Sequence, residues 1–512
     1  MLIWWSSLAF GAPTVGAIVN PRVAVDTASD RDGEDPLAMH TWVRGFVRDE
    51  TSRGDRWFVE AWFQHHLLLG QDPGIQAPDN NEAFYELSLG PTGVDVRLGG
   101  ENSPVRLRAG ALIENTGQLE LLPVNDLINP VDGRIGLLTP REFQRLPVPL
   151  ATLKIAKGRF RSETTYVPFA TPDRLWLRET DWSILRQRMI DDYLADIQGP
   201  VDLEEGEFPA GFGAASQWRS FVQSIRRNNL RESNNTSYRR GRDFATNTNN
   251  LPQAFVGDIV QQFRYDGPGF DIGVVGGRIR SRFPQAVLRE DLQLALQDRD
   301  ELFALINDGL FGDAGARVSR AESITDSTLT FDWPYSWMAG ADGSTIVGDV
   351  ALRAEVGFLS DRVVRQTWGR SRTAPQLAGG LGIDITRGSG FAMSIEGRVQ
   401  RIFVDAADED ELVFSRPLQV QVAGGFQGSF AQERFKWQIS GAIDPTFLEA
   451  FVRPTLAWRV SQAVELELGG IIIDGFEVAP PETLEDALTY EGGALSYWAQ
   501  NDGVTFGIRW VL

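Results

Sequence analysis

Histidine is the side chain best suited to acid–base catalysis near neutral pH, and this chain has three, His40, His65 and His66. A serine hydrolase would need one of them beside a serine and an orienting amide or carboxylate, and no spacing in the sequence supports that arrangement. Gly-x-Ser-x-Gly, Walker and His-Glu-x-x-His motifs do not occur. Cysteine is absent, which excludes thiolate zinc sites, cysteine nucleophiles and disulfides. We therefore predict no catalytic residue, no metal site and no cofactor.

Two further groups of side chains have a chemical and a structural interpretation. His65 and His66 lie in the aromatic-rich segment 57–69. They could bind a metal or act in catalysis, but we favour a position in the belt of aromatic residues at the membrane interface. The acidic run 405–411 could hold calcium or bridge lipopolysaccharide through divalent ions. It lacks the twelve-residue spacing of a calcium loop, so we favour a solvated loop.

Composition narrows the class of protein. The 512 residues include 49 Lys and Arg against 69 Asp and Glu, a net charge of −20, which argues against a nucleic-acid partner. A mean hydropathy of −0.19 argues against a helical membrane protein. Abundant glycine (52) and tryptophan (15) in an acidic chain without cysteine are typical of a bacterial outer-membrane β-barrel.

The elements that would position any functional side chain are strands with a period of two. Apolar and polar residues alternate over 345–358, 391–403, 447–460 and 462–472, among other segments. These runs exceed the average globular strand of about 5–6 residues and fit the tilted strands of a membrane barrel, about 9–11 residues long. A large soluble β-sandwich is the alternative. We predict an all-β fold, a transmembrane antiparallel β-barrel with an even strand number of about 16–20 and helical loop insertions.

The polar faces of these strands would point into the barrel lumen. Charges of both signs suit either a water-filled pore or a lumen held together by ion pairs, and do not suit a tunnel for fatty acids. The lumen-facing candidates are Arg106, Arg108, Arg353, Glu355, Glu396, Arg398, Arg434, Lys436, Arg453, Arg459, Glu465, Glu467 and Arg509.

The two ends of the chain carry separate signals. Residues 1–17 are apolar and end in small residues, which predicts a signal peptide, and 18–38 is interpreted as a polar lead-in. The remainder, 39–512, is predicted to be a single barrel. The last ten residues alternate and place Phe506 and Trp510 on one face, similar to the terminal signal recognised by the barrel-assembly machinery.

Twenty candidate strands can be counted, among them 209–225 and 490–500. Long insertions separate them at 114–149, 168–208, 226–252, 283–323 and 475–489. Apolar residues at helical spacing predict a helix over 284–309, which would cap a barrel mouth, dock a partner or pack as a loop. Counting back from a periplasmic C-terminus places 283–323 and 475–489 at the periplasmic end, opposite to the usual position of long loops.

The segment 104–170 resembles a family of channel-like outer-membrane proteins from Gram-negative bacteria whose function is undefined. The residues that carry the resemblance are Asn125–Asp132 (NDLINPVD), Arg145–Leu150 (RLPVPL) and Glu163–Phe169 (ETTYVPF). The resemblance implies a channel-like barrel associated with envelope transport and transfers no catalytic residue. Asn129, Pro130 and Asp132 have turn chemistry, and 121–149 is either a turn-forming connection, which we favour, or a constriction loop.

Three functions follow for testing. The first is a channel or transport barrel for solutes or envelope components in the bacterial outer membrane. The second is a structural barrel that anchors a periplasmic or surface assembly, and the third is an outer-membrane hydrolase. The expected partners are outer-membrane lipid and lipopolysaccharide, the barrel-assembly machinery through the C-terminal strand, and a periplasmic or surface protein.

Overall fold

The computed structural model describes residues 13–27, 37–51, 54–69, 83–99, 103–133, 136–169, 171, 173, 189, 257–283, 285–288, 329–387, 390–499 and 501–512. Among these residues, no helix has the length and apolar character needed to cross a bilayer.

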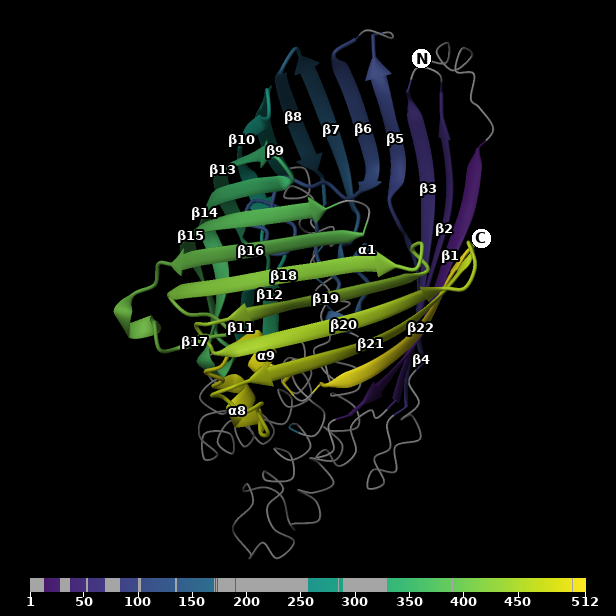
Figure 1. Cartoon of the computed structure of the whole chain (residues 1–512). Helices are drawn as coiled ribbons and strands as arrows, with labels where there is room; N and C mark the ends of the chain where they lie inside the picture. The colour runs from purple at the N-terminus through teal and green to yellow at the C-terminus, as the bar shows by residue number, and fades with distance from the viewer. Residues whose placement is uncertain are drawn as a thin grey trace, which may run out of the picture.

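The strands form one antiparallel sheet that closes on itself, because β1 pairs with both β2 and β22 (Figure 1). Eighteen strand positions make up the barrel, since β4 and β5 follow one another beside β3 and the two-residue β17 pairs only with β14. The predicted all-β barrel with an even strand number is confirmed. The barrel strands are β1 (Thr14–Asp26), β2 (Leu37–Glu50), β3 (Arg56–Leu69), β4 (Ala83–Leu89), β5 (Thr92–Leu98), β6 (Val105–Leu112), β7 (Val148–Lys157), β8 (Phe160–Val167), β9 (Asp258–Gly267), β10 (Phe270–Arg280), β13 (Tyr335–Val347), β14 (Val350–Gln366), β15 (Ser371–Arg387), β16 (Phe391–Ile402), β18 (Leu418–Phe430), β19 (Phe435–Asp444), β20 (Glu449–Arg459), β21 (Val464–Gly475) and β22 (Gly503–Val511).

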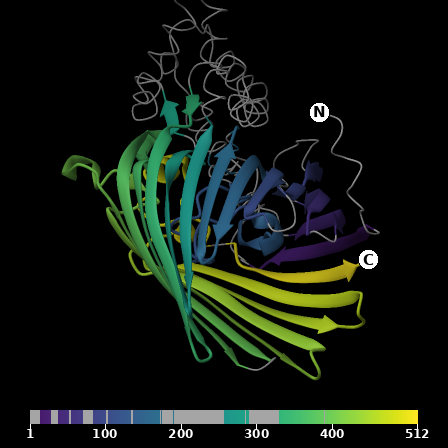
Figure 2. The same ribbon diagram turned by 90° about the horizontal axis from the view of Figure 1, so that it is seen from above.

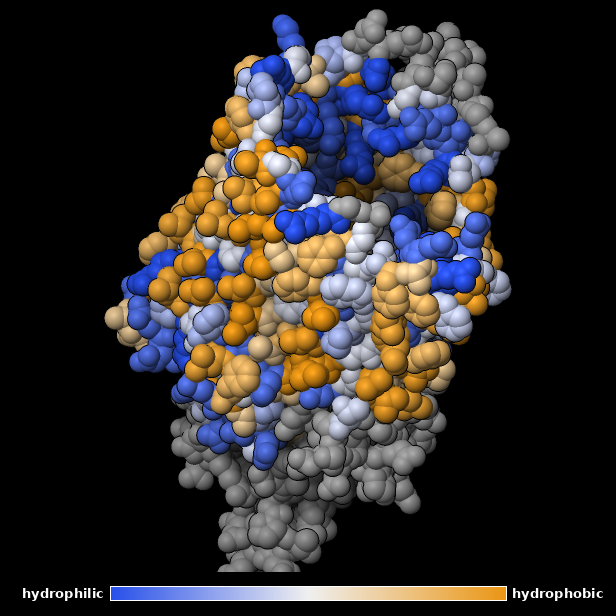
Figure 3. Space-filling model, viewed as in Figure 1, coloured by the Kyte–Doolittle hydropathy of each residue, from blue (hydrophilic) through white to orange (hydrophobic). Residues whose placement is uncertain are grey.

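Alternation along each strand separates an apolar outside from a polar inside. Cross-strand partners share a face, so Ile439, Leu456 and Leu468 lie outside and exposed while Ser440 and Glu467 face the lumen. The apolar band is visible on the outer surface, and a hydrophilic hollow opens above it (Figure 3). A closed sheet with an apolar exterior and a polar lumen is the architecture of an outer-membrane barrel, where no strand edge is left unpaired in hydrocarbon. The chain is an outer-membrane β-barrel.

Aromatic side chains gather outside the barrel near the hairpin turns. Phe160, Tyr265 and Phe270 contact one another in sequence, and Phe430 and Phe435 stack with ring centroids 5.1 Å apart. Such rings occupy the boundary between hydrocarbon and water. They mark one edge of the membrane-spanning band.

All long connections lie at one end of the barrel. At the end that holds the C-terminus, the strands are joined by connections of at most six residues, such as 158–159 and 460–463. The connections 113–147, 168–257, 281–334 and 476–502 lie at the opposite end. Short periplasmic turns and longer extracellular loops are the usual arrangement, so the C-terminal end is the periplasmic one.

The strand count that placed 283–323 and 475–489 at the periplasmic end therefore contained an error. Its cause is the candidate strand 490–500, which is no strand: it contains the short helix α9 (Ala494–Tyr497), and α8 (Leu484–Leu488) precedes it. Tyr497 is fully buried and contacts Tyr490 edge to face, so the alternation there reflects helix packing. Counting this segment as a strand exchanged the periplasmic and extracellular ends for the connections that precede it.

The N-terminal expectation also needs correction. Residues 14–26 form β1, which closes the barrel, so the polar lead-in expected from residue 18 is wrong over 18–26. The expected signal peptide lies outside the described residues up to residue 12, and its residues 14–17 belong to β1.

The predicted helix over 284–309 is contradicted where the structure describes it. Gln285–Leu288 is the strand β11, which pairs with β12 (Leu329–Asp332) in a separate two-stranded sheet. Most of 168–208, the insertion 226–252, the candidate strand 209–225 and the rest of 284–309 lie outside the described residues.

Candidate functional site in the barrel lumen

The connection between β6 and β7, residues 113–147, folds back into the barrel, and we call it the lumen loop. Figure 2 shows the ring of strands surrounding this blue segment. It contains a 3₁₀ turn (Gly136–Leu138) and the single-turn helix α1 (Arg141–Gln144). It coincides with the insertion expected at 114–149.

Two carboxylates on the lumen wall hold the first half of the lumen loop. Glu396 on β16, fully buried, accepts hydrogen bonds from the backbone N–H groups of Glu120 at 2.9 Å and of Leu121 and Leu122 at 2.8 Å. Glu355 on β14 accepts four more, from the N–H groups of residues 118, 119, 124 and 125. A buried carboxylate needs such partners, and charge-assisted bonds of this kind are stronger than neutral ones.

Three arginines hold carbonyl groups of the same loop. Arg353 and Arg398 donate to the carbonyl oxygens of Gln118 at 2.5 Å and Pro123 at 3.1 Å. Arg453, on the other side of the barrel, donates to that of Leu137 at 2.8 Å. Arg353 also forms an ion pair with Glu396 at 3.0 Å, so one positive charge offsets the buried carboxylate.

Glycines on the wall make room for the loop. A Cβ atom added to Gly380 would lie 2.5 Å from the Leu119 side chain, and one at Gly382 would lie 2.9 Å from it. A Cβ at Gly357 would lie 2.6 Å from the Asn125 side-chain oxygen. These distances are shorter than van der Waals contact, so larger residues at these positions would push the loop away from the wall.

The motif singled out by the sequence closes the base of the loop. The Asn129 amide donates to the carbonyl oxygens of Leu112 at 3.0 Å and Leu146 at 2.9 Å, and its oxygen accepts from the N–H of Glu114 at 2.8 Å. The Pro130 carbonyl accepts from the Leu146 N–H, and the N–H of Asp132 donates to the Gln144 carbonyl. The motif thus forms a short antiparallel bridge, between Val131 and Arg145, that closes the base of a loop lying in the lumen, and it is more than a turn-forming connection.

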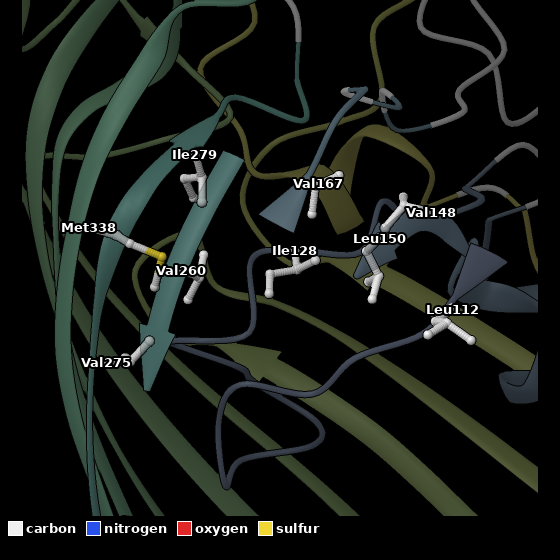
Figure 4. Close-up of a cluster of buried hydrophobic side chains, with 9 residues drawn as sticks. All are labelled: Leu112, Ile128, Val148, Leu150, Val167, Val260, Val275, Ile279 and Met338. Atoms are coloured by element: carbon white, nitrogen blue, oxygen red, sulfur yellow. The ribbon is translucent and has the colours of Figure 1, made fainter. Parts of the chain in front are cut away.

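Apolar contacts anchor this base. Ile128 is fully buried and lies between side chains of β7 and β8 and those of β9, β10 and β13 (Figure 4). Phe143, one residue before the base, packs on β2 and β3, where its ring lies 5.1 Å from that of Trp62 on β3 and 6.3 Å from that of Trp42 on β2. The lumen loop therefore contacts the β2–β3 wall as well as β14 and β16.

A cavity of about 900 Å³ remains between the lumen loop and the wall formed by β18 to β21, and we call it the eyelet. It stays open because the wall facing it carries small side chains. Its lining on the wall includes Ala423, Ser440, Ala442, Thr455 and Ala457.

The eyelet is amphipathic. Leu121, Leu122, Leu137 and Pro140 line it from the loop, and charged side chains line the opposite wall. These charges are paired across strands: Arg22 with Glu467 and Lys436 with Glu465, both at 2.8 Å. Solutes would meet an apolar edge on one side and two ion pairs on the other.

The predicted lumen-facing residues occupy three kinds of position. Arg353, Glu355, Glu396, Arg398 and Arg453 hold the lumen loop. Lys436, Glu465 and Glu467 line the eyelet, with Arg459 and Arg509 beside Glu465 near the periplasmic rim. Arg106 pairs with Asp95, and Arg108 pairs with Glu114 at the start of the loop.

Arg434 is the exception, because it lies exposed in the periplasmic turn between β18 and β19. The alternation extended from 430 through 443 without a break, and the turn at residues 431–434 was counted as strand. The prediction that Arg434 faces the lumen is wrong.

Sequence reasoning missed Arg22, His40 and Trp42. Arg22 was placed in the lead-in, although Asn20 and Arg22 alternate with Val19, Pro21 and Val23, a weak signal for a strand. His66 was interpreted as a belt residue, but it is buried on the lumen side next to Trp42, and only its neighbour His65 points the other way.

The acidic run 405–411, in the connection after β16, forms ion pairs with arginines at the start of β15 and just before it. Glu411 pairs with Arg370 at 2.7 Å, and Asp408 pairs with Arg372. Within the described part of the chain, no three His, Asp or Glu side chains come together as a metal site would require.

Comparison with models of known protein families finds no match, and comparison with curated proteins finds none. Solved structures similar to this chain include OccK3 (OpdO) of Pseudomonas aeruginosa, with a TM-score of 0.41, 9% identity, and coverage of 97% of this chain and 95% of that one. OpdK of Pseudomonas aeruginosa, solved with vanillate, has a TM-score of 0.42 and 7% identity over 98% of each chain. OmpF of Salmonella typhi, in complex with daunomycin, has a TM-score of 0.37, 10% identity, and coverage of 98% and 97%.

Proposed function

We propose that this protein is a channel that lets small water-soluble solutes cross the outer membrane through the eyelet. The observation that carries the proposal is the cavity of about 900 Å³ left beside a loop that is bound to β14 and β16 by seven backbone hydrogen bonds to Glu355 and Glu396. A loop held so firmly narrows the lumen without filling it. A wide barrel with such a loop selects solutes by size and surface chemistry.

The lining suggests the class of solute. The ion pairs Arg22–Glu467 and Lys436–Glu465 offer hydrogen-bond donors and acceptors of both charges, and the loop edge offers Leu121, Leu122 and Leu137. Compact solutes that combine a polar or zwitterionic group with an apolar part can contact both edges at once. The proposal assigns no enzymatic activity to the chain.

The test is single-channel conductance in planar bilayers. Ser440→Trp places a large ring in the eyelet, and we expect it to lower the conductance at least twofold. Ile439→Trp is the matched control, because the neighbouring side chain faces lipid and should leave the conductance unchanged. Absence of conductance in the folded wild-type protein, or equal conductance in the two variants, would contradict the proposal.

A further inference from the structure

Two histidines on neighbouring strands share one hydrogen bond inside the lumen wall. His40 on β2 and His66 on β3 are paired in register, and their Nδ1 atoms are 2.9 Å apart. Only 2% and 3% of their surfaces are exposed. At this distance, one Nδ1 must donate and the other must accept, so one of the two nitrogens carries no proton.

The pair lies against the aromatic group that receives the lumen loop. Both imidazoles contact Trp42, each with ring centroids 5.6 Å apart, and Trp42 contacts Phe143 of α1. Nε2 of His40 and Nε1 of Trp42 are buried without a hydrogen-bond partner within the described residues. A charge added to this group of buried rings would therefore be poorly stabilised.

The charged groups that face the pair come from the adjacent strands. Arg22 on β1 is in register with His40, and it is paired with Glu467. On the other side, Arg44 pairs with Glu60 at 2.7 Å, and Glu86 on β4 is in register with Gln64. Because Arg22 is the nearest charge in register and is positive, a second proton on the pair would add charge of the same sign beside it.

We propose that the His40–His66 pair is an acid-sensitive switch for the eyelet. When the accepting Nδ1 binds a proton, its lone pair is lost, the shared hydrogen bond breaks, and the imidazolium requires water that the aromatic contact surface excludes. The contact between Trp42 and Phe143 then opens, and α1 moves away from the β2–β3 wall.

The direction of the response follows from the position of α1. Pro140 and Gln144, on either side of Phe143, line the eyelet. A shift of α1 away from β2 and β3 moves these residues into the cavity, while Glu355 and Glu396 still hold the first half of the loop. Acidification that adds the second proton to the pair therefore narrows the eyelet, at a pH lower than a solvent-exposed imidazole would need.

Two readouts test the switch, and only one depends on conduction. The chain has no native cysteine, so Gln144→Cys can be labelled with bimane, a fluorophore that nearby tryptophan quenches. Between pH 7.5 and about pH 3.5 we expect bimane fluorescence to rise at least twofold as α1 leaves Trp42 and Trp62, and single-channel conductance to fall at least twofold.

The decisive variant is His40→Phe with His66→Phe, which keeps the ring volume and removes both titrating groups. Both responses should disappear in it and persist in His65→Phe, the adjacent histidine that faces outward. A folded barrel is recognised by its heat-modifiable migration in gel electrophoresis. If the double variant does not show it, the same two measurements are made on His66→Gln, whose amide can still form a hydrogen bond with His40.

A double variant that responds like the wild type, or a wild type without a fluorescence response, would overturn the switch. A wild type that carries no current at any pH but keeps the histidine-dependent fluorescence response would contradict the proposed channel and support the switch. Conduction without that response would support the channel and overturn the switch.

Discussion

The carboxylate of Glu396 and the backbone N–H of Leu122 meet at 2.8 Å, although 274 positions separate them in the chain. This bond and its neighbours join the lumen loop to a strand formed much later in the sequence. Glu396 thereby connects the two parts of the molecule that define the eyelet, the loop and the wall.

Removing this carboxylate should release the loop. Glu396→Ala removes the acceptor of three part-buried N–H groups and one of the partners of Arg353, and we expect the free energy of unfolding to fall by about 2–5 kcal/mol. Urea unfolding in detergent micelles measures this change. Open-channel current should also become noisier, because the loop samples several positions.

Glu465→Ala is the control for this experiment. Its partner Lys436 is 39% exposed at the side chain, so loss of this pair should cost at most about 1 kcal/mol. Equal destabilisation by the two substitutions would show that Glu396 does not hold the loop.

A valine side chain in place of Gly380 should also displace the lumen loop. Gly380→Val places atoms where the Leu119 side chain lies, and we expect a cost of about 1–3 kcal/mol together with altered conductance. Gly379→Val, one position away, points toward lipid, and its added Cβ would have its nearest neighbour at 3.8 Å. If both variants conduct like the wild type, the glycines do not seat the loop.

The assignment of strand faces predicts the effect of charge. Leu456→Arg puts a cation into hydrocarbon near the middle of β20 and should cost about 2–4 kcal/mol or prevent assembly. The adjacent Thr455→Arg points into the eyelet and should assemble normally. The yield of heat-modifiable barrel in outer membranes distinguishes the two variants. Similar yields would contradict the assignment of lipid-facing and lumen-facing residues.

Protonation of Asp173 should stabilise the base of the lumen loop, whereas protonation of the histidine pair releases α1 from the wall. Its carboxylate accepts the Val131 N–H at 2.7 Å, and burial raises its pKa from 3.8 to about 6. The folded protein therefore holds this proton more tightly than the unfolded chain, and stability should increase as the pH falls through about 6 toward about 4. Asp173→Asn should remove this increase, measured as the pH dependence of the urea midpoint. An unchanged dependence would assign it to other groups.

The barrel could be predicted from the sequence because alternation is a local property. Ile439 and Ser440 lie on opposite faces as their hydropathy indicates, and each barrel strand repeats that pattern. The errors arose where alternation has another cause. Residues 490–500 alternate around the buried Tyr497 of a short helix, and the acidic residues Asp30, Asp32, Glu34 and Asp35 led us to group 18–26 of β1 with a polar lead-in.

The site could be predicted only in part. Arg353, Glu355 and Glu396 were correctly placed on the lumen face, but their partners are backbone groups more than 200 positions away. No local pattern encodes a bond to a backbone N–H, because every residue except proline has one. The eyelet itself depends on Ser440 and Ala442 being small, which acquires meaning only once the loop is known to lie opposite.

The most direct test of the eyelet is cysteine modification during a bilayer recording, since the chain has no cysteine of its own. Addition of a bulky water-soluble methanethiosulfonate reagent to Ser440→Cys channels should lower the current in discrete, irreversible steps until reductant restores it. Ile439→Cys channels, labelled only from the lipid side, should not respond. Current through Ser440→Cys that is unaffected by complete modification would contradict the eyelet as the conducting path.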